Sequence, residues 1–273
     1  MAITHTKPDP STAHTTELSG HVALVTGGTR GIGAAICRSL AADGAIVAAG
    51  FSSNRERADE LRQSIETDGG TLTLHQGNVG EYEDCQRVVH DVIDEHGRLD
   101  ILVNNAGVTV DRPVWKMSLD DWHKVLRVNL SGAFYMTKPA LVHMLERGSG
   151  RIINISSVTG ETGNIGQANY TASKAGLFGL TKTLAREAAF ALRASGKLDA
   201  GVGLTVNAVT PGLIETDMVA TIPPFMLNQF LEDIPMHRMG QPGEVGRVVC
   251  FLADDASGYI TGQVWGVNGG LDM

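Results

Sequence analysis

Three side chains suited to proton transfer lie near one another in the middle of the chain: Ser157, Tyr170 and Lys174. Tyr170 and Lys174 are four positions apart with no Pro or Gly between them, so on a helix they share one face. A lysine ammonium beside a phenol favours the phenolate and lowers the pKa of the tyrosine from its ordinary value near 10. Such a tyrosine can act as a general acid or base near neutral pH. Taken alone, the pair is more often an ordinary surface pair on a helix, so the remaining chain must decide.

The elements around these residues form the pattern of an α/β protein. Ser157 follows an apolar run, residues 151–155, that predicts a buried strand, and Tyr170 begins a long helical pattern to about Arg193. Strands are also predicted at residues 21–25, 45–49, 71–75, 100–103, 204–209 and 263–267, and helices at 34–42, 55–68, 85–95, 119–143 and 244–252. Strands that alternate with helices in this way indicate βαβ units and a parallel sheet. Pro139 lies inside the 119–143 pattern, where it is expected to kink or break the helix.

A glycine-rich turn follows the first predicted strand. The segment from Thr26 to Gly33 carries glycines at 27, 31 and 33, and it includes Thr29, Arg30 and Ile32. Glycines let the backbone turn tightly and approach a pyrophosphate, and the N-terminus of the next helix supplies N–H groups and the positive end of its dipole. The strand–turn–helix context supports a dinucleotide site, although an ordinary glycine-rich loop is the alternative.

The end of the second strand bears on the choice of cofactor. In an NAD site an acidic residue there binds the ribose hydroxyls, but here no Asp or Glu occurs before Glu56. Instead, hydrogen-bond donors are present at Ser52, Ser53, Asn54 and Arg55, and Arg30 adds charge from the glycine-rich turn. This combination favours NADP, because a carboxylate would repel a 2′-phosphate and guanidinium groups bind one. The alternative is that both arginines are solvated surface charges.

Further candidate ligand-contacting residues follow the later strands. Asn78 and Val79 are a plausible lip of an adenine pocket, and the small residues of Asn104-Asn105-Ala106-Gly107 permit close approach of backbone to a ligand. Asn129 lies among apolar residues and must find hydrogen-bond partners. Two readings of Asn129 stay open: it ties helix backbone to a neighbouring strand, or it also orders water near a reacting group.

Composition limits the class of protein. The chain has 273 residues, 42% of them hydrophobic, and no internal repeat, so we expect one domain from residue 20 to 273 after a disordered tail at 1–19. A net charge of -8 argues against a nucleic-acid binder, and no apolar run is long enough to span a membrane. The three cysteines are scattered and no Cys-x-x-Cys or Cys/His cluster occurs, so we expect reduced thiols, a cytoplasmic protein and no metal site. A proline-, methionine- and phenylalanine-containing stretch at about 213–240 is interpreted as a lid over the site, or as a helical hairpin covering the core.

These motifs together resemble the short-chain dehydrogenase/reductase family, from about Gly20 to the C-terminus. Thr26-Gly27-x-x-x-Gly31-x-Gly33 is similar to its cofactor loop, Asn104-Asn105-Ala106-Gly107 to its fourth-strand motif, and Pro211-Gly212 to its nicotinamide-side motif. The resemblance implies a catalytic tetrad of Asn129, Ser157, Tyr170 and Lys174, where Ser157 fits better than Ser156 because it lies thirteen residues before Tyr170. It implies a single-domain Rossmann-like doubly wound fold of about seven parallel strands with helices on both faces, and cofactor contacts from Pro211, Gly212, Ile214 and Thr216.

Within the family, the likeness is to 3-oxoacyl-[acyl-carrier-protein] reductases and acetoacetyl-CoA reductases, carried by Gly166 to Tyr170, Val206 to Val209, Ile214 to Met218 and Asn268 to Leu271. It implies reduction of a 3-oxoacyl thioester with NADPH, and a homotetramer. A dehydrogenase for an alcohol, sugar or steroid with NAD preferred is the alternative, and a catalytically idle nucleotide sensor or scaffold is a third reading. The sequence departs from the pattern of these reductases by an extra segment at about 190–203. This segment is expected to alter the surface near the site and therefore the choice of acyl carrier. Arg147, Arg151, Arg186, Arg193 and Lys197 are candidate contacts for an acidic carrier, with scattered surface charges as the commoner case.

Overall fold

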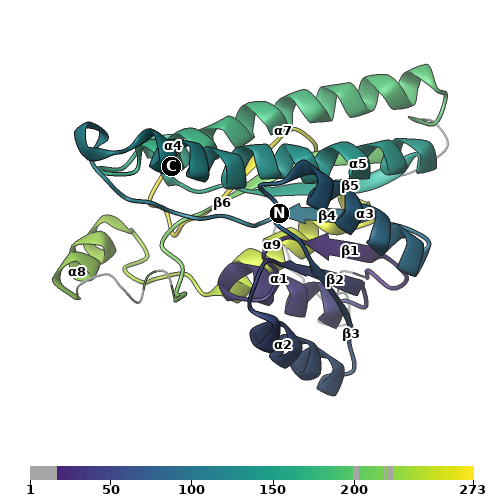
Figure 1. Ribbon diagram of the computed structural model, residues 1–273, viewed down its shortest axis with the longest axis horizontal. Coiled ribbons are helices and arrows are strands. Elements are labelled where there is room, and N and C mark those ends of the chain that lie inside the picture. Colours follow the sequence, from purple (N-terminus) through teal and green to yellow (C-terminus); the bar gives the residue numbers. More distant parts are fainter. Residues whose placement is uncertain (1–16, 199–202, 218, 220–223) are drawn as a thin grey trace, which may run out of the picture.

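The computed structural model describes residues 17–198, 203–217, 219 and 224–273. Seven parallel strands form one sheet in the order β3-β2-β1-β4-β5-β6-β7. The strands are β1 (Val22–Val25), β2 (Ile46–Phe51), β3 (Thr71–Gln76), β4 (Ile101–Asn104), β5 (Ser149–Ile155), β6 (Gly203–Pro211) and β7 (Val264–Val267). The predicted Rossmann-like fold is therefore confirmed (Figure 1).

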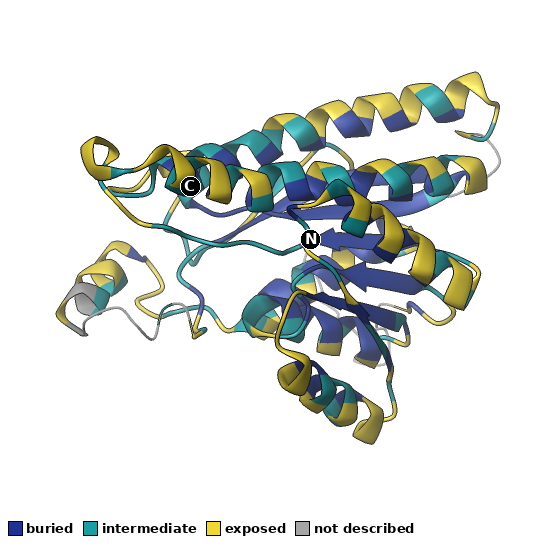
Figure 2. Cartoon of the chain, viewed as in Figure 1, coloured by how far each residue is buried: buried dark blue, intermediate teal, exposed yellow. Residues whose placement is uncertain are grey.

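Helices cover both faces of the sheet. They are α1 (Gly31–Ala42), α2 (Arg55–Thr67), α3 (Tyr82–His96), α4 (Leu119–Leu126), α5 (Gly132–Arg147), α6 (Thr159–Thr162), α7 (Ala168–Ala194), α8 (Pro224–Asp233) and α9 (Pro242–Ala253), with short turns η2 (Val114–Lys116), η3 (Arg127–Ser131) and η6 (Asp255–Ser257). The five inner strands are buried on both sides, while each long helix exposes one face, as Figure 2 shows. This is why the inner strands are mostly apolar and the helices are amphipathic, whereas the edge strands β3 and β7 are partly exposed.

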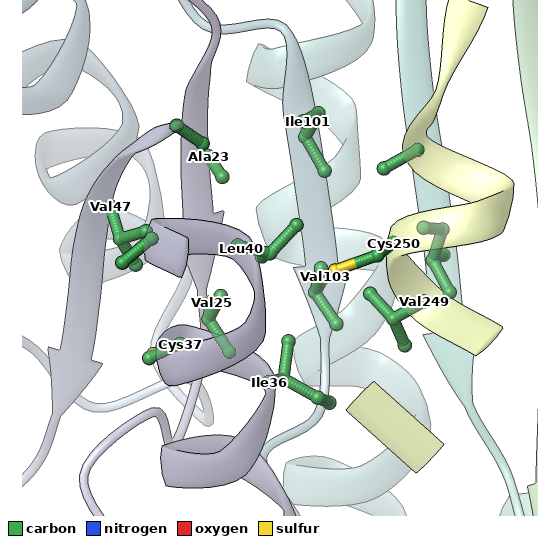
Figure 3. Packing of buried hydrophobic residues seen from close by; sticks show 14 of the residues in the cluster. Ala23, Val25, Ile36, Cys37, Leu40, Val47, Ile101, Val103, Val249 and Cys250 are labelled. Carbon is green, nitrogen blue, oxygen red and sulfur yellow. The ribbon is translucent and has the colours of Figure 1, made fainter. Parts of the chain in front are cut away.

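Two apolar clusters hold the layers together. On one face, Ile36 and Leu40 of α1 and Val249 of α9 pack against Val25 and Val103 of the sheet (Figure 3). On the other face, residues of α3, α5 and α7 pack against the sheet, among them Val89, Met144 and Leu184. All three cysteines are buried and free, and burial raises the pKa of each thiol. They contribute to the core as small apolar side chains.

The packed domain begins before Gly20. Leu18 is fully buried, and its N–H donates to the carbonyl of Asp43, so residues 18 and 19 belong to the domain. The predicted tail at 1–16 lies outside the described residues.

The long helical pattern at 119–143 is interrupted at a place that the sequence does not indicate. Pro139 lies inside α5 without ending it, whereas η3 is a wide π-type turn at residues 127–131 that contains Asn129. A π-type turn accommodates one extra residue per turn and is frequent at functional sites. The expected break at Pro139 is wrong, and the irregularity lies ten residues earlier, where it directs the Asn129 amide into the protein.

The described part of the extra segment, residues 190–198, lies far from Tyr170. α7 continues through Ala194, and Lys197 then donates to the last carbonyls of α5 from Leu145 and Glu146. At 1.5 Å per residue, Ala194 is about 36 Å along the helix from Tyr170. These residues are at the end of α7 opposite to the site, so they do not form part of the surface near it. Residues 199–202 lie outside the described part of the chain.

Candidate active site

The sheet reverses its strand order between β1 and β4, and the loops after these two strands diverge there. In open α/β sheets, ligands bind outside the carboxyl ends of the strands at such a point. Thr26, at the end of β1, joins the two loops: its Oγ1 accepts from the backbone N–H groups of Asn105 and Ala106, each at 3.0 Å. The Asn105 amide donates in return to the carbonyls of Thr26 and Gly27 at 2.9 and 3.1 Å. The first loop and the Asn105–Gly107 loop therefore form one rigid unit.

The glycine-rich turn is built for close packing. Gly27 and Gly31 have positive φ angles of 59° and 50°. Gly33 lies inside α1, where a Cβ would clash with the Gly27 carbonyl oxygen and lie 2.6 Å from the Asn105 amide nitrogen. The N-cap residue Arg30 makes no side-chain capping bond, and the first turn of α1 holds no acidic residue. The N–H groups at the start of α1 are thus oriented toward the crevice without a side-chain acceptor of their own, which suits a pyrophosphate.

The loop after β6 folds against this turn. A Cβ on Gly31 would lie 3.4 Å from the Thr216 side chain, and a Cβ on Gly212 would lie 2.7 Å from Cα of Asn268. Ile214 pairs with Gly240 in a short parallel bridge, so the predicted lid segment begins and ends side by side. Between these ends, α8 stands apart from the sheet at the left of Figure 1, while residues 218 and 220–223 lie outside the described part of the chain.

The residues predicted to select the cofactor lie at the exposed end of β2. Arg30, Ser52, Ser53, Asn54 and Arg55 are all exposed. Asn54 uses its side-chain oxygen to cap α2, accepting from the N–H of Arg57, and Arg55 pairs with Asp59 at 3.0 Å. Arg57 was not among the predicted residues, yet its guanidinium reaches Asp217 of the β6 loop at 2.9 Å. The basic side chains of this corner are therefore partly engaged with carboxylates.

Asn78 and Val79 lie beyond β3, where the Asn78 N–H donates to Asp84 and its side chain accepts from Gly80 N–H. These bonds shape the turn before α3. A Cβ on Gly132 would meet Val79 at 2.9 Å, so this turn packs directly on the start of α5.

Ser157, Tyr170 and Lys174 converge at the carboxyl end of β5. Lys174 is buried, and its ammonium donates to the Ile155 carbonyl at 2.8 Å and lies 5.6 Å from the centre of the Tyr170 ring. The Ser157 hydroxyl hydrogen-bonds to Tyr170 and accepts from the N–H and the hydroxyl of Thr159 at 3.3 and 3.1 Å. A Cβ on Gly107 would lie 3.6 Å from the Lys174 ammonium and 3.5 Å from the Asn129 side-chain oxygen, so the β4 loop adjoins the same cluster.

The electrostatics of this cluster differ from the expectation. Burial raises the pKa of Tyr170, Asp111 acts in the same direction, and the hydrogen bond from Ser157 acts against both. Burial also lowers the pKa of Lys174 to about 8. The ammonium faces the ring and the Ile155 carbonyl rather than the phenol oxygen, which is why the predicted lowering of the Tyr170 pKa by Lys174 is not seen.

Asn129 has well-defined partners. Its side-chain oxygen accepts from Val108 N–H at 2.8 Å, and its amide donates to the Val108 carbonyl and to the Ser173 hydroxyl at 3.0 and 3.1 Å. Ser173 donates in turn to the Tyr170 carbonyl at 2.7 Å. Asn129 therefore fixes the loop after β4 to α7 beside the Ser157–Tyr170–Lys174 cluster, and its role in ordering water stays a prediction.

Two further positioning residues were missed from spacing alone. The buried Asn169 accepts from Tyr170 N–H and donates to the carbonyls of Val110 and Asp121, thereby fixing the start of α7. Near the C-terminus, Asp272 hydrogen-bonds to Glu161 of α6, and burial followed by this contact raises the pKa of Glu161. The signal that could have indicated Asn169 is its place directly before Tyr170. No sequence signal indicates the contact between Glu161 and Asp272.

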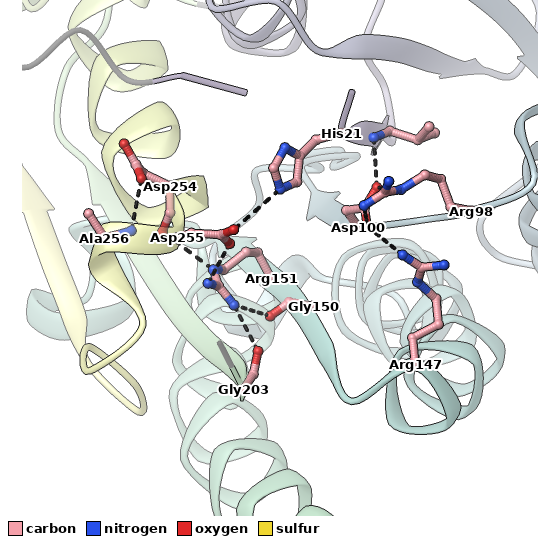
Figure 4. A network of polar contacts seen from close by, with 11 residues as sticks. His21, Arg98, Asp100, Arg147, Gly150, Arg151, Gly203, Asp254, Asp255 and Ala256 are labelled. Atoms are coloured by element: carbon pink, nitrogen blue, oxygen red, sulfur yellow. Dashed lines mark hydrogen bonds and ion pairs between the residues drawn. The ribbon is translucent and has the colours of Figure 1, made fainter. Parts of the chain in front are cut away.

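The five basic residues considered for an acidic carrier are not gathered near this site; Arg186 lies on α7, sixteen residues after Tyr170. Arg147 and Arg151 face the opposite end of the sheet, where they pair with Asp100 and Asp255 (Figure 4). Lys197 caps α5, and Arg193 is in the last turn of α7. Among the described residues, no helix is both long and apolar enough to cross a membrane.

Residues 21–226 match the family model described as short chain dehydrogenase. The chain belongs to this family. It is 46% identical over 250 residues to an acetoacetyl-CoA reductase of Rhizobium meliloti, covering 91% of this chain and 97% of the relative. It is 44% identical over 259 residues to a 3-oxoacyl-[acyl-carrier-protein] reductase of Synechocystis (94% and 99%), and 43% identical over 254 residues to that of Thermotoga maritima (93% and 98%). As a short-chain dehydrogenase the protein is an oxidoreductase, and its matched region contains the glycine-rich turn and the Ser157–Tyr170–Lys174 cluster.

Proposed function

We propose that this short-chain dehydrogenase reduces the ketone of a 3-oxoacyl thioester to a 3-hydroxyacyl thioester with NADPH. The observation that carries the proposal is the cluster of Ser157, Tyr170 and Lys174 beside the glycine-rich turn, at the carboxyl edge of the sheet. The names of relatives at 43–46% identity over nearly the whole chain supply the substrate class. Because both coenzyme A and carrier-protein reductases are among them, the acyl carrier is a matter for experiment.

The crevice suits a nicotinamide dinucleotide. The close packing of Gly27, Gly31 and Gly33 leaves room for a pyrophosphate at the start of α1, and exposed Arg30 and Arg55 favour a 2′-phosphate over a bare ribose. Asn105, Ala106, Gly107 and Lys174 line the nicotinamide side, with Pro211, Gly212, Ile214 and Thr216 on the loop above it. When bound, NADPH supplies the hydride to the ketone carbon.

The side chains of the cluster then handle the ketone oxygen. Tyr170 donates its proton as negative charge develops on that oxygen, and its raised pKa keeps the proton in place at neutral pH. The Ser157 hydroxyl, already beside the phenol, holds the oxygen in line. Lys174 is protonated below a pKa of about 8, and we assign its ammonium to the cofactor ribose rather than to the phenol oxygen. Asn129 keeps the β4 loop and α7 in register so that these groups stay aligned.

Assembly and location are part of the same proposal. Phe134 and Val142 on α5 and Phe190 on α7 are large apolar side chains at 46%, 55% and 76% exposure. Burying such side chains against another copy supports an oligomer with these helices at one interface. The family resemblance makes a homotetramer our proposal, with a cytoplasmic location. Light scattering that gives a monomer would rule out this assembly. The segment at 213–240 is proposed as the lid over the acyl group.

The test is turnover of acetoacetyl-CoA and acetoacetyl-carrier protein with NADPH and, separately, with NADH. We expect oxidation of NADPH, and Tyr170→Phe should lower turnover roughly 10³-fold because it removes the donated proton. NADPH binding, followed by fluorescence, should be unchanged in that variant. An inactive wild type that still binds NADPH would shift the assignment to an alcohol, sugar or steroid substrate. Comparable turnover by Tyr170→Phe would instead reject the mechanism.

A further inference from the structure

A cluster of metal-ligating side chains lies at the outer edge of the sheet, apart from the active site. β3 is the edge strand, and it carries Thr73 and His75 on the same face. Glu95 and His96 are the last two residues of α3, which ends at Gly97 with a φ of 73°. The metal-ligating atoms of His75, Glu95 and His96 all lie within 4.8 Å of one another.

The distances within this cluster are informative. The Nε2 atom of His75 is 3.6 Å from Oε2 of Glu95, and that of His96 is 4.0 Å from Oε1 of the same carboxylate. Both separations are too long for hydrogen bonds. They are close to the separation of about 3.3 Å expected between two ligands that each lie about 2.0 Å from a tetrahedral ion. The carboxylate and the two imidazoles therefore surround a point rather than bond to each other.

Thr73 adds a fourth polar atom on the inner side. Its hydroxyl is 2.9 Å from His75 Nε2 and 3.2 Å from His96 Nε2. A hydroxyl has one proton, so it can donate to one imidazole while the other must donate to it. The two Nε2 atoms thus both face the Thr73 hydroxyl, and the exposed Glu95 carboxylate lies beside them.

The ligand types also suit a metal. His75 is buried, His96 is partly buried and Glu95 is exposed. Two imidazoles and one carboxylate are ligands for Zn²⁺ and its neighbours among the transition metals, rather than for Mg²⁺ or Ca²⁺.

We propose that His75, His96 and Glu95 bind a divalent transition-metal ion of the Zn²⁺ class, with Thr73 or water in the fourth position. The ion joins the edge strand β3 to the last turn of α3. None of its ligands belongs to the cofactor crevice or to the Ser157–Tyr170–Lys174 cluster, so the role of the ion is to stabilise the fold. Nothing in the linear spacing indicates such a site, because His75 and His96 are separated by most of α3.

The experiment uses the full chain after removal of metals with a chelator. Zn²⁺ is expected to raise the melting temperature where Mg²⁺ does not, and Co²⁺ should give the visible absorption of a tetrahedral site. Glu95→Gln preserves the shape of an exposed side chain and should weaken Zn²⁺ binding at least about tenfold, and His96→Ala should weaken it more. The matched control is His90→Ala, because His90 is an exposed histidine of the same helix that lies outside the cluster.

Three results would decide the matter. Loss of the Zn²⁺ shift in Glu95→Gln and His96→Ala, with the shift retained in His90→Ala, supports the site. The proposal is overturned if Zn²⁺ leaves the melting temperature unchanged, or if all three variants bind it as the wild type does. The measurement does not depend on reductase activity, and NADPH oxidation should be the same in Glu95→Gln and in the wild type.

Discussion

At the amino-terminal edge of the sheet, the carboxylate of Asp100 accepts from the Val22 N–H at 2.9 Å and from Arg98 at 2.7 and 2.8 Å. At the carboxyl edge, Lys174 is equally buried, but it faces a backbone carbonyl and the face of a tyrosine ring. Charges at the first edge are therefore paired with carboxylates, whereas no carboxylate among the described residues contacts the Lys174 ammonium. The pKa of Lys174 falls to about 8 because burial there is uncompensated.

Arg151 extends the contrast. It is 2% exposed, yet it donates to the carbonyls of Gly150 and Gly203 at 2.9 Å and pairs with Asp255 at 2.9 Å (Figure 4). Its bonds join β5, β6 and η6 at the edge opposite to the site. The difference teaches that one edge of this sheet is arranged for stability and the other for chemistry, so substitutions at the two edges should separate these properties.

The largest expected effect is for Lys174→Met. Turnover should fall roughly 10³-fold, because the ammonium proposed to hold the cofactor ribose beside Tyr170 is lost. At about pH 7 the free energy of unfolding of the same variant should exceed that of the wild type by about 2 kcal/mol. The gain arises because the variant no longer buries a charge, and it is reduced because the Ile155 carbonyl loses its hydrogen-bond donor. Steady-state kinetics and urea unfolding would measure both changes.

This stability gain depends on pH in a defined direction. The folded-state pKa of Lys174, about 8, lies below its ordinary value of 10.5, so between these values the unfolded chain binds more protons at this position. The wild type therefore gains stability as pH rises through this range, and its deficit relative to Lys174→Met should shrink toward about pH 10. A deficit that stays constant with pH would show that the buried charge is not its cause.

Ser157→Ala should lower turnover roughly 10²-fold with little change in stability, because one hydrogen bond to the developing oxyanion is lost. Ser156 is the matched control. Its hydroxyl donates to the Lys174 carbonyl at 2.7 Å, within the protein, so Ser156→Ala should lower the melting temperature more than the rate. Kinetics and thermal unfolding of both variants test the assignment, and equal losses of rate would remove the distinction between the two serines.

Asp100→Asn, at the amino-terminal edge, should lower stability without lowering the rate. Replacing the carboxylate by a neutral amide leaves Arg98 and Arg147 without their anion and should lower the free energy of unfolding by about 3 kcal/mol. The kcat of the folded fraction should be unchanged. A loss of kcat comparable with that of Ser157→Ala would contradict the separation of the two edges.

The smallest expected effect concerns cofactor choice. Arg30→Ser should reduce the preference for NADPH over NADH roughly tenfold, because it removes one of the guanidinium groups proposed to bind the 2′-phosphate. Arg38→Ser is the control, since Arg38 lies on the same helix and donates to Ser64 rather than facing the glycine-rich turn. The ratio of kcat/KM for the two cofactors would measure the change.

The sheet, its helices and the position of the cluster could all be predicted from the sequence, because they depend on local patterns. A strand buried on both faces needs a continuous apolar run, and Gly33 is needed where a Cβ would clash with the Gly27 carbonyl. Four-residue spacing on a helix places Tyr170 and Lys174 on one face whatever the rest of the fold. These constraints act over a few residues, so they can be read from the chain.

What only the tertiary structure decided are the relations between residues far apart in the sequence. The partner of the Lys174 ammonium is the Ile155 carbonyl, nineteen residues away, which turns the charge to the Tyr170 ring, and burial raises the tyrosine pKa instead of lowering it. The far position of residues 190–198, the π-type turn at Asn129 and the meeting of His75 with His96 are of the same kind. These relations depend on how distant elements pack and on how far burial removes a charge from water. The spacing of residues along the chain encodes neither the packing nor the burial.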